Sequence, residues 1–283
     1  MTLDIDYLRG WIGRTETLED QVTAAPLRAL TATLDRDDAP TGPAGTLPPC
    51  WHWLYFLPTH RQSEIGSDGH LLRGGFLPPV PLPRRMWAGS SISFHAPLHV
   101  GQTLRRSSRI SDVQIKDGRT GPLVFVRVHH EIEGDGRLAV VDEHDIVYRD
   151  LPAPDEPAAA PLAAAGEGHW SRRIVPDDVL LFRYSALTFN GHRIHYDRKY
   201  VTHVEGYPGL IVHGPLIATL LLDLLRRQLP DACVKTFVFR ALKPLFDTAP
   251  FLVCGRQDDV ETVKLWACTE DGQLAMDATA TLC

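Results

Sequence analysis

The sequence predicts an α+β fold built from two copies of one unit, each an antiparallel sheet curled around a helix. Both halves of the chain end in strand-like runs separated by turns that contain Asp-Gly. One helix is apolar almost all round, so it must be covered on most sides. Short stretches also recur in the same order in both halves: residues 94–98 resemble 241–245, and residues 135–139 resemble 271–275. We interpret this recurrence as an ancient internal duplication.

The first half, residues 1–150, is expected to hold a helix followed by strands. Residues 18–34 are the expected helix, with a weaker apolar pattern than its counterpart in the second half. The expected strands are residues 91–94, 102–110, 123–132 and 138–148, with turns at 116–118 and 134–136.

A linker is expected at residues 151–168, where four prolines and seven alanines fall within eighteen positions. Such a composition is extended and semi-rigid, and it buries little surface. The linker separates the first unit from a second unit at residues 169–283.

In the second half the apolar helix spans residues 216–225, interrupted only by Thr219 and Asp223. Pro215 suits its first turn, and two arginines follow its apolar stretch, where cations meet the negative end of the helix dipole. The expected strands after it are residues 235–240, 251–257, 262–269 and 274–282, with a turn at 270–272.

Composition excludes several functional classes. The net charge is −6 and the isoelectric point is near 6.1, which argues against binding to nucleic acid. No apolar run approaches the ~20 residues that span a bilayer, and the N-terminus has no signal sequence, so we expect a cytoplasmic protein without membrane contact. The five cysteines are scattered and are expected to be reduced thiols. Without a dinucleotide fingerprint, a P-loop or a nucleophile elbow, redox, kinase and serine-hydrolase functions have no support.

A dense polar cluster lies at residues 182–197, just ahead of the apolar helix. Unpaired polar groups cost about 1–3 kcal/mol each when buried, so their presence beside a core element needs a reason. The pattern Tyr-x-x-Leu-Thr-x-Asn-x-x-x-Ile-His, followed about eighteen residues later by His-Gly-Pro-Leu, resembles the hydratase signature of MaoC-like hot-dog enzymes. The similarity is strongest to the double-hot-dog subfamily, which includes 3-hydroxyacyl-thioester dehydratase type 2 and the itaconyl-CoA and mesaconyl-C4-CoA hydratases. Residues 47–56, LPPCWHWLYF, are a second support.

The resemblance implies a double hot-dog fold, two antiparallel sheets each wrapped around a central helix, and reversible addition of water to an α,β-unsaturated acyl thioester. It places His195 on the catalytic histidine of the family and Gly214 on the glycine whose N–H faces the thioester oxygen. Asn190 stands where single-hot-dog hydratases carry an aspartate. Because an amide cannot accept a proton, this departure puts a mechanism with two bases in doubt.

Elementary chemistry still allows hydration with one base. His195 titrates near neutrality, so it can take a proton from water and return it to the α-carbon. Asn190 can orient the water, and the Gly214 N–H, where the apolar helix begins, can stabilise the developing oxyanion. We therefore expect these three residues to be catalytic.

Six further residues are expected to bind substrate: Tyr184, His192, Arg193, His213, Trp51 and Trp53. Each has a plainer alternative. Arg193 can hold a substrate carboxylate or a CoA phosphate, or it can cap the local turn. Trp51 and Trp53 can shape the acyl pocket or pack in the core, and His213 can simply begin the helix. His192 and His195 could ligate a metal with Asp197, but no further ligand completes the set, so we expect no metal and no cofactor apart from the CoA of the substrate.

The expected enzyme is a hydro-lyase acting on itaconyl-CoA or mesaconyl-C4-CoA and giving citramalyl- or methylmalyl-CoA. One alternative is dehydration of linear 3-hydroxyacyl thioesters, on CoA or acyl carrier protein. Another is a hot-dog protein that binds or hydrolyses thioesters without hydrating them. The first half has no equivalent of Asn190 and His195, so we expect it to form the acyl side of the cleft. Both a monomer and a homodimer remain open, because the fused pair already supplies the interface of a single-unit dimer.

Overall fold

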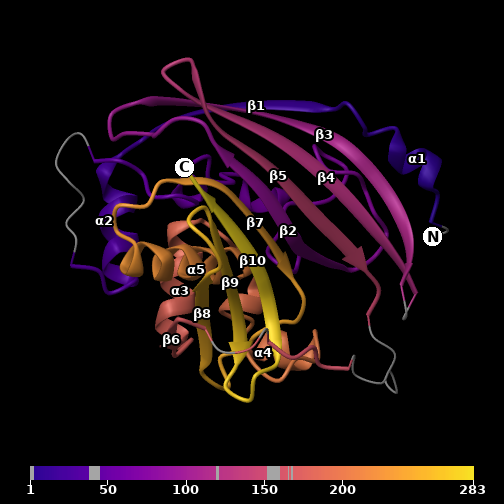
Figure 1. Ribbon diagram of the computed structural model, residues 1–283. Coiled ribbons are helices and arrows are strands. Elements are labelled where there is room, and N and C mark those ends of the chain that lie inside the picture. The colour runs from indigo at the N-terminus through magenta and orange to yellow at the C-terminus, as the bar shows by residue number, and fades with distance from the viewer. Residues whose placement is uncertain (1–2, 38–44, 119–120, 152–159, 165, 167) are drawn as a thin grey trace.

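The structure is a computed structural model that describes residues 3–37, 45–118, 121–151, 160–164, 166 and 168–283. Its centre is one continuous antiparallel sheet of ten strands in the order β1-β3-β4-β5-β2-β7-β10-β9-β8-β6 (Figure 1). The strands are β1 (Thr15–Gln21), β2 (Arg84–Phe94), β3 (Thr103–Gly118), β4 (Gly121–Gly134), β5 (Arg137–Arg149), β6 (Trp170–Ile174), β7 (Val234–Ala241), β8 (Phe251–Gln257), β9 (Thr262–Thr269) and β10 (Leu274–Leu282).

The two halves of the sheet have the same strand order. In each half the first strand lies at the outer edge, the third, fourth and fifth follow, and the second lies innermost. The halves meet where β2 pairs with β7, from Gly89↔Arg240 to Ser93↔Thr236. Equal topology in both halves is what the internal duplication predicts, and the edge-to-edge junction makes one sheet of the two units.

The helices are unequal between the halves. They are α1 (Ile5–Arg9), α2 (Ala24–Thr33), α3 (Asp178–Leu187), α4 (Arg198–His203) and α5 (Gly214–Gln228), with 3₁₀ turns η1 (Trp51–Leu54), η2 (Gln62–Glu64) and η3 (Arg193–His195). The helix expected at residues 18–34 begins only at Ala24, because residues 15–21 form the edge strand β1. This strand was missed since its sequence, TETLEDQ, is mostly polar and no residue in it is fully buried.

α5 is the central helix of the second half, and its burial is as predicted. Ten consecutive residues, 216 to 225, are buried, and the helix packs on β8, β9 and β6. In the first half, the described residues between α2 and β2, 34–37 and 45–83, form only the 3₁₀ turns η1 and η2 as helical elements. α2 itself contacts α3 and η1, so it joins a core that both halves share.

Asp223, the charged residue within the buried stretch of α5, is stabilised there by ion pairs. Its side chain is fully buried, and it forms ion pairs with Arg36 at 2.6 Å and with Arg172 and Arg227 at 2.8 Å. Because Arg36 comes from the first half and Arg172 from β6, the cluster ties the end of α5 to both units.

The second part of the expected linker lies against the sheet. Leu274 donates its N–H to Leu162 at 2.7 Å, and Ala164 donates to Gly272 at 2.9 Å. Residues 152–159, 165 and 167 lie outside the described residues. The turn expected at 116–118 is wrong, because those residues continue β3. Among the described residues no helix is long and apolar enough to cross a membrane.

Candidate active site

The polar cluster of the sequence becomes a tight turn between α3 and α4. α3 ends at Leu187, and the chain reverses through Phe189, which has a positive φ of 48°. Asn190 holds this turn, because its N–H donates to the Ser185 carbonyl at 2.8 Å and its Oδ1 accepts the N–H of His192 at 3.0 Å. η3 follows directly and buries His195.

His195 is held as a neutral base. Its Nδ1 lies 2.7 Å from the carbonyl oxygen of Ile211, so Nδ1 must carry the proton and Nε2 keeps its lone pair. Burial lowers the pKa of His195 to about 4. At neutral pH the ring is therefore uncharged and ready to accept a proton at Nε2.

His213 supports the position of His195. The two rings stack with centroids 3.7 Å apart and an interplanar angle of 17°. His213 is fully buried, its Nε2 lies 2.8 Å from the Ser185 hydroxyl, and the Tyr184 ring lies edge-on to it at 5.0 Å. Burial keeps the pKa of His213 well below its usual value, so this second imidazole is also neutral.

Gly214 places the start of α5 beside these rings. It is the first residue of the helix, directly after His213. A Cβ atom built on Gly214 would meet no atom within 4 Å apart from its chain neighbours and its own helix, so side chains from other elements do not crowd this position. Gly214 also stands at the positive end of the helix dipole, which favours a negatively polarised oxygen.

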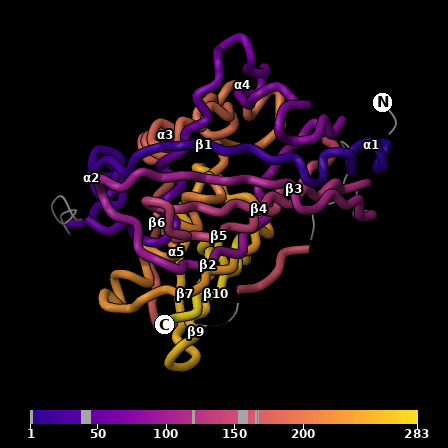
Figure 2. The backbone as a smooth tube through the Cα atoms, turned by 90° about the horizontal axis from the view of Figure 1, so that it is seen from above, coloured from indigo at the N-terminus to yellow at the C-terminus, as the bar shows by residue number. Residues whose placement is uncertain are grey.

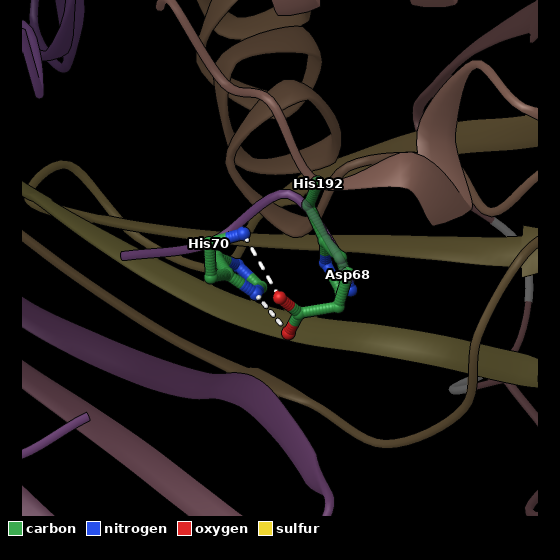
Figure 3. Close-up of side chains that lie close together, drawn as sticks. All are labelled: Asp68, His70 and His192. Atoms are coloured by element: carbon green, nitrogen blue, oxygen red, sulfur yellow. Dashed lines mark hydrogen bonds and ion pairs between the residues drawn. The ribbon is translucent and has the colours of Figure 1, made fainter. Parts of the chain in front are cut away.

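The first half contributes residues that the sequence interpretation missed. Its segment before β2, violet in Figure 2, lies beside α4, and Asp68 and His70 in it reach the hydratase motif. Figure 3 shows Asp68, His70 and His192 together, with Asp68 Oδ2 3.0 Å from His70 Nδ1 and the rings of His70 and His192 3.9 Å apart. In the sequence these residues stand out only as a short Ser-Asp-Gly-His turn. That pattern gives no indication that they contact the distant His192.

The docking of this segment is close. The Arg193 N–H donates to the Asp68 carbonyl at 2.9 Å. Gly69, with φ of +90°, lies so near Gly191 that a Cβ on it would stand 1.8 Å from the Gly191 carbonyl oxygen. Only glycine fits this approach, so the first half forms one wall of the motif.

Asp68, His70 and His192 are also the donor types that a transition metal binds, with ligand atoms within 4.8 Å of one another. In this structure Asp68 and His70 hydrogen-bond to each other, and the His70 and His192 rings are tilted by 41° with their centroids 3.9 Å apart. The other combination, His192 with His195 and Asp197, is not assembled. Asp197 instead accepts from Arg193 and from the Tyr200 N–H.

The sequence comparison assigns the family. Residues 50–247 match the profile described as "Hydroxyacyl-thioester dehydratase type 2". The chain belongs to the hydroxyacyl-thioester dehydratase type 2 family. It is 48% identical over 276 residues to the mesaconyl-C(4)-CoA hydratase of Chloroflexus aurantiacus, covering 96% of both chains.

Solved structures confirm the double hot-dog fold. A MaoC-like dehydratase from Phytophthora capsici superposes with a TM-score of 0.71 at 14% identity, covering 99% of this chain and 98% of that one. A Mycobacterium tuberculosis protein described as having a double hot-dog fold covers 96% of both chains with a TM-score of 0.60 and 13% identity.

In this member of the dehydratase family, Arg193 is already engaged. Its Nε and Nη2 donate to Asp197 at 3.0 and 2.7 Å, and its Nη1 donates to the Ser67 carbonyl at 2.9 Å. The guanidinium also lies over the Tyr200 ring, 4.2 Å from its centroid. Through these contacts Arg193 fixes the motif against the first half. They agree with the alternative that Arg193 caps the local turn.

The two tryptophans lie in the 3₁₀ turn η1 of the first half. Trp51 lies under Arg226, twelve residues beyond Gly214 and so about 18 Å along the axis of α5. Trp53 donates its indole N–H to Asp142 at 3.1 Å and packs against Trp87 and the shared core. These surroundings agree with the alternative that Trp51 and Trp53 pack in the core.

Proposed function

We propose that this chain reversibly hydrates an α,β-unsaturated acyl-CoA thioester of the mesaconyl-C4 type. The identity of 48% over nearly the whole length to a mesaconyl-C(4)-CoA hydratase supports this substrate class. The observation that carries the chemistry is the neutral His195 beside the open start of α5. Hydration of an enoyl thioester requires a proton acceptor and a donor to the thioester oxygen, and His195 and the Gly214 N–H are proposed for these two roles.

In the proposed mechanism His195 is the only base. The water oxygen bonds to the β-carbon while His195 Nε2 takes one of its protons, and the electron pair of the double bond moves toward the thioester oxygen. The Gly214 N–H stabilises this enolate oxygen at the start of α5. The imidazolium then returns the proton to the α-carbon, so the elements of water are added and His195 is neutral again.

Asn190 and the buried neighbours of His195 have supporting roles in this proposal. Asn190 Oδ1 accepts one N–H from the turn and keeps a second lone pair with which it can orient the water. His213, bonded to Ser185 and stacked on His195, keeps the catalytic ring in one orientation. The mechanism uses no cofactor beyond the CoA of the substrate.

The first half is proposed to form the acyl side of the cleft. The docked turn with Asp68 and His70 supports this arrangement, because it places first-half residues against His192. Trp51 and Trp53 were expected to shape the acyl pocket, but they contact Arg226 and Asp142 instead. In this proposal the segment before β2 forms that side of the pocket.

The function is tested by following absorbance of the enoyl thioester and release of free thiol for mesaconyl-C4-CoA and crotonyl-CoA. We expect loss of enoyl absorbance without thiol release and a strong preference for the dicarboxylic mesaconyl-C4-CoA. Thiol release would indicate a thioesterase, absence of both signals a binding protein, and preference for crotonyl-CoA a dehydratase of linear chains. His195→Ala is expected to abolish hydration, and near-normal turnover would exclude His195 as the base.

The β2–β7 junction already joins two hot-dog units within one chain. We propose a monomer or a homodimer, which light scattering of the purified protein distinguishes.

A further inference from the structure

The cluster of Asp68, His70 and His192 has no role in the proposed mechanism. Two of its members come from the first half and the third from the hydratase motif, more than a hundred residues away in the sequence (Figure 3). In the part of the chain that the structure describes, it is the one group of three such side chains whose ligand atoms all lie within 4.8 Å of one another. A carboxylate and two imidazoles therefore meet where the two halves of the chain touch.

Asp68 and His70 are already separated by nearly the distance between two ligands of one ion. Asp68 Oδ2 lies 3.0 Å from His70 Nδ1, and Oδ1 of the same carboxylate accepts the backbone N–H of His70 at 3.0 Å. Two ligands of a tetrahedral zinc ion, with bonds of about 2.1 Å, lie about 3.4 Å apart. An ion that takes the place of the bonding proton would move Oδ2 and Nδ1 apart by only about 0.4 Å, while the ring keeps its proton on Nε2.

His192 supplies a buried imidazole that lacks a hydrogen-bond partner. The residue is only 9% exposed, and its ring contacts the rings of His70 at 3.9 Å and His195 at 5.5 Å between centroids. No described residue forms a hydrogen bond with either of its ring nitrogens; only its backbone N–H is bonded, to Asn190. Because buried polar groups are normally paired, an unpaired imidazole beside two other donors indicates a ligand for these nitrogens.

The three side chains are in the protonation states that bind a metal. Burial lowers the pKa of both His70 and His192, so both imidazoles are neutral at pH 7. Burial alone would raise the pKa of Asp68, but its hydrogen bonds with His70 lower that pKa overall, and the carboxylate is ionised. Metal ligation requires neutral imidazole and ionised carboxylate, so no ligand has to lose a proton first.

The backbone holds the two contributing segments together at this point. The Arg193 N–H donates to the Asp68 carbonyl at 2.9 Å, and Gly69 lies so close to Gly191 that no Cβ fits between them. The main chain on both sides of the cluster is therefore fixed. A side-chain rotation of His192 is enough to bring its ligand atom from within 4.8 Å of the others to the separation of about 3.4 Å that a tetrahedral ion needs.

We propose that Asp68, His70 and His192 bind one divalent transition metal ion of the zinc type, which ties the first-half turn to the motif. Two imidazoles and a carboxylate are donors that zinc binds, and water completes a fourth position. Mg²⁺ and Ca²⁺ prefer oxygen ligands, so two imidazoles disfavour them. The sequence indicated no metal because His192, His195 and Asp197 form no complete set; here the first half supplies the missing ligands. This proposal does not depend on the proposed hydratase function.

The test measures metal binding to the full chain, purified without a histidine tag and treated with a chelator. Co²⁺ is titrated first, because its visible spectrum reports the coordination geometry, and Zn²⁺ is then measured by competition. We expect one ion per chain and an affinity about 10- to 100-fold lower in His70→Asn and in His192→Asn. His129→Asn is the matched control, since His129 also lies near carboxylates, 3.2 Å from Glu143 and 3.4 Å from Glu131. It should bind the ion as the wild type does.

Thermal unfolding gives a second readout that needs no substrate. Zn²⁺ at a hundredfold excess over its Kd should raise the Tm of the wild type by about 5 °C and leave that of His192→Asn unchanged.

Three results would overturn the proposal. They are no binding of Co²⁺ or Zn²⁺ by the wild type, equal binding by the wild type and both cluster variants, or an equal loss in His129→Asn. If the histidine variants do not fold, the affinity of Asp68→Asn decides in their place. Absence of metal binding leaves the proposed function intact, and absence of hydration leaves the metal site intact.

Discussion

Gly69→Ala tests whether the docked turn of the first half is part of the active site. The new Cβ would stand 1.8 Å from the Gly191 carbonyl oxygen and 2.7 Å from its carbonyl carbon. Both are backbone atoms, so no side-chain rotation relieves the contact. The turn and the motif must separate by about 1.2 Å before the oxygen contact reaches even the 3.0 Å limit of real structures.

The expected cost has two parts. A non-glycine residue at positive φ costs about 1–2 kcal/mol, and overpacking costs about 1–3 kcal/mol more. Gly74→Ala isolates the first part, because Gly74 has a φ of +95° and its Cβ would meet only Pro79 Cβ, at an ordinary 3.7 Å. We therefore expect Gly69→Ala to lose about 2–5 kcal/mol of unfolding free energy and Gly74→Ala about 1–2 kcal/mol.

Urea unfolding and hydratase kinetics measure the two effects separately. A displacement of about 1 Å in the motif can reduce the rate about 100-fold, so Gly69→Ala should lose activity under conditions where it is still folded. Gly74→Ala should keep most of its activity. Equal stability and equal activity of the two variants would refute the conclusion that the turn supports the motif.

Three further predictions concern the motif and the core. Asn190→Asp should keep hydration within a few-fold, because a carboxylate oxygen still accepts the His192 N–H; complete loss in the kinetic assay would instead show that the amide is required. The value of kcat/KM should stay level from pH 8 to about 5 and fall below that. His195 has a pKa lowered to about 4 and is an active base only while unprotonated; an acid limb centred near pH 6.5 would contradict this. Asp223→Asn should lower the unfolding free energy by about 3–5 kcal/mol, because three arginines lose a buried partner. Asp277→Asn, which removes an exposed pair, should cost less than about 1 kcal/mol in the same urea titration.

Much of the fold is predictable from local patterns. The strands at residues 251–257, 262–269 and 274–282 lie where alternation and turn residues predict them. The burial of α5 follows from its composition, because an almost wholly apolar helix has no stable exposed face. The motif residues are also near one another in sequence, so His192, His195 and His213 come together largely through one turn and one helix start.

What the sequence alone could not determine depends on contacts between distant segments. The edge strand β1 is mostly polar and is defined only by its pairing with β3. Asp68 and His70 lie beside His192 although more than a hundred residues separate them in the sequence. The residues that flank them in the sequence do not indicate this contact. Whether an arginine is free or paired likewise depends on which carboxylate the fold brings near it.

The sequence by itself determined the apolar central helix and the strands that follow it, because both depend on short-range periodicity. Its resemblance to the dehydratase family is what proposes His195, Asn190 and Gly214 as the catalytic residues. The tertiary structure decided which first-half residues face those groups. It engages Arg193 with Asp197 and docks Asp68 and His70 against the motif. The physical reason is that hydrogen bonds and ion pairs act over a few ångströms in space, and only the folded sheet sets that distance for residues far apart in the chain.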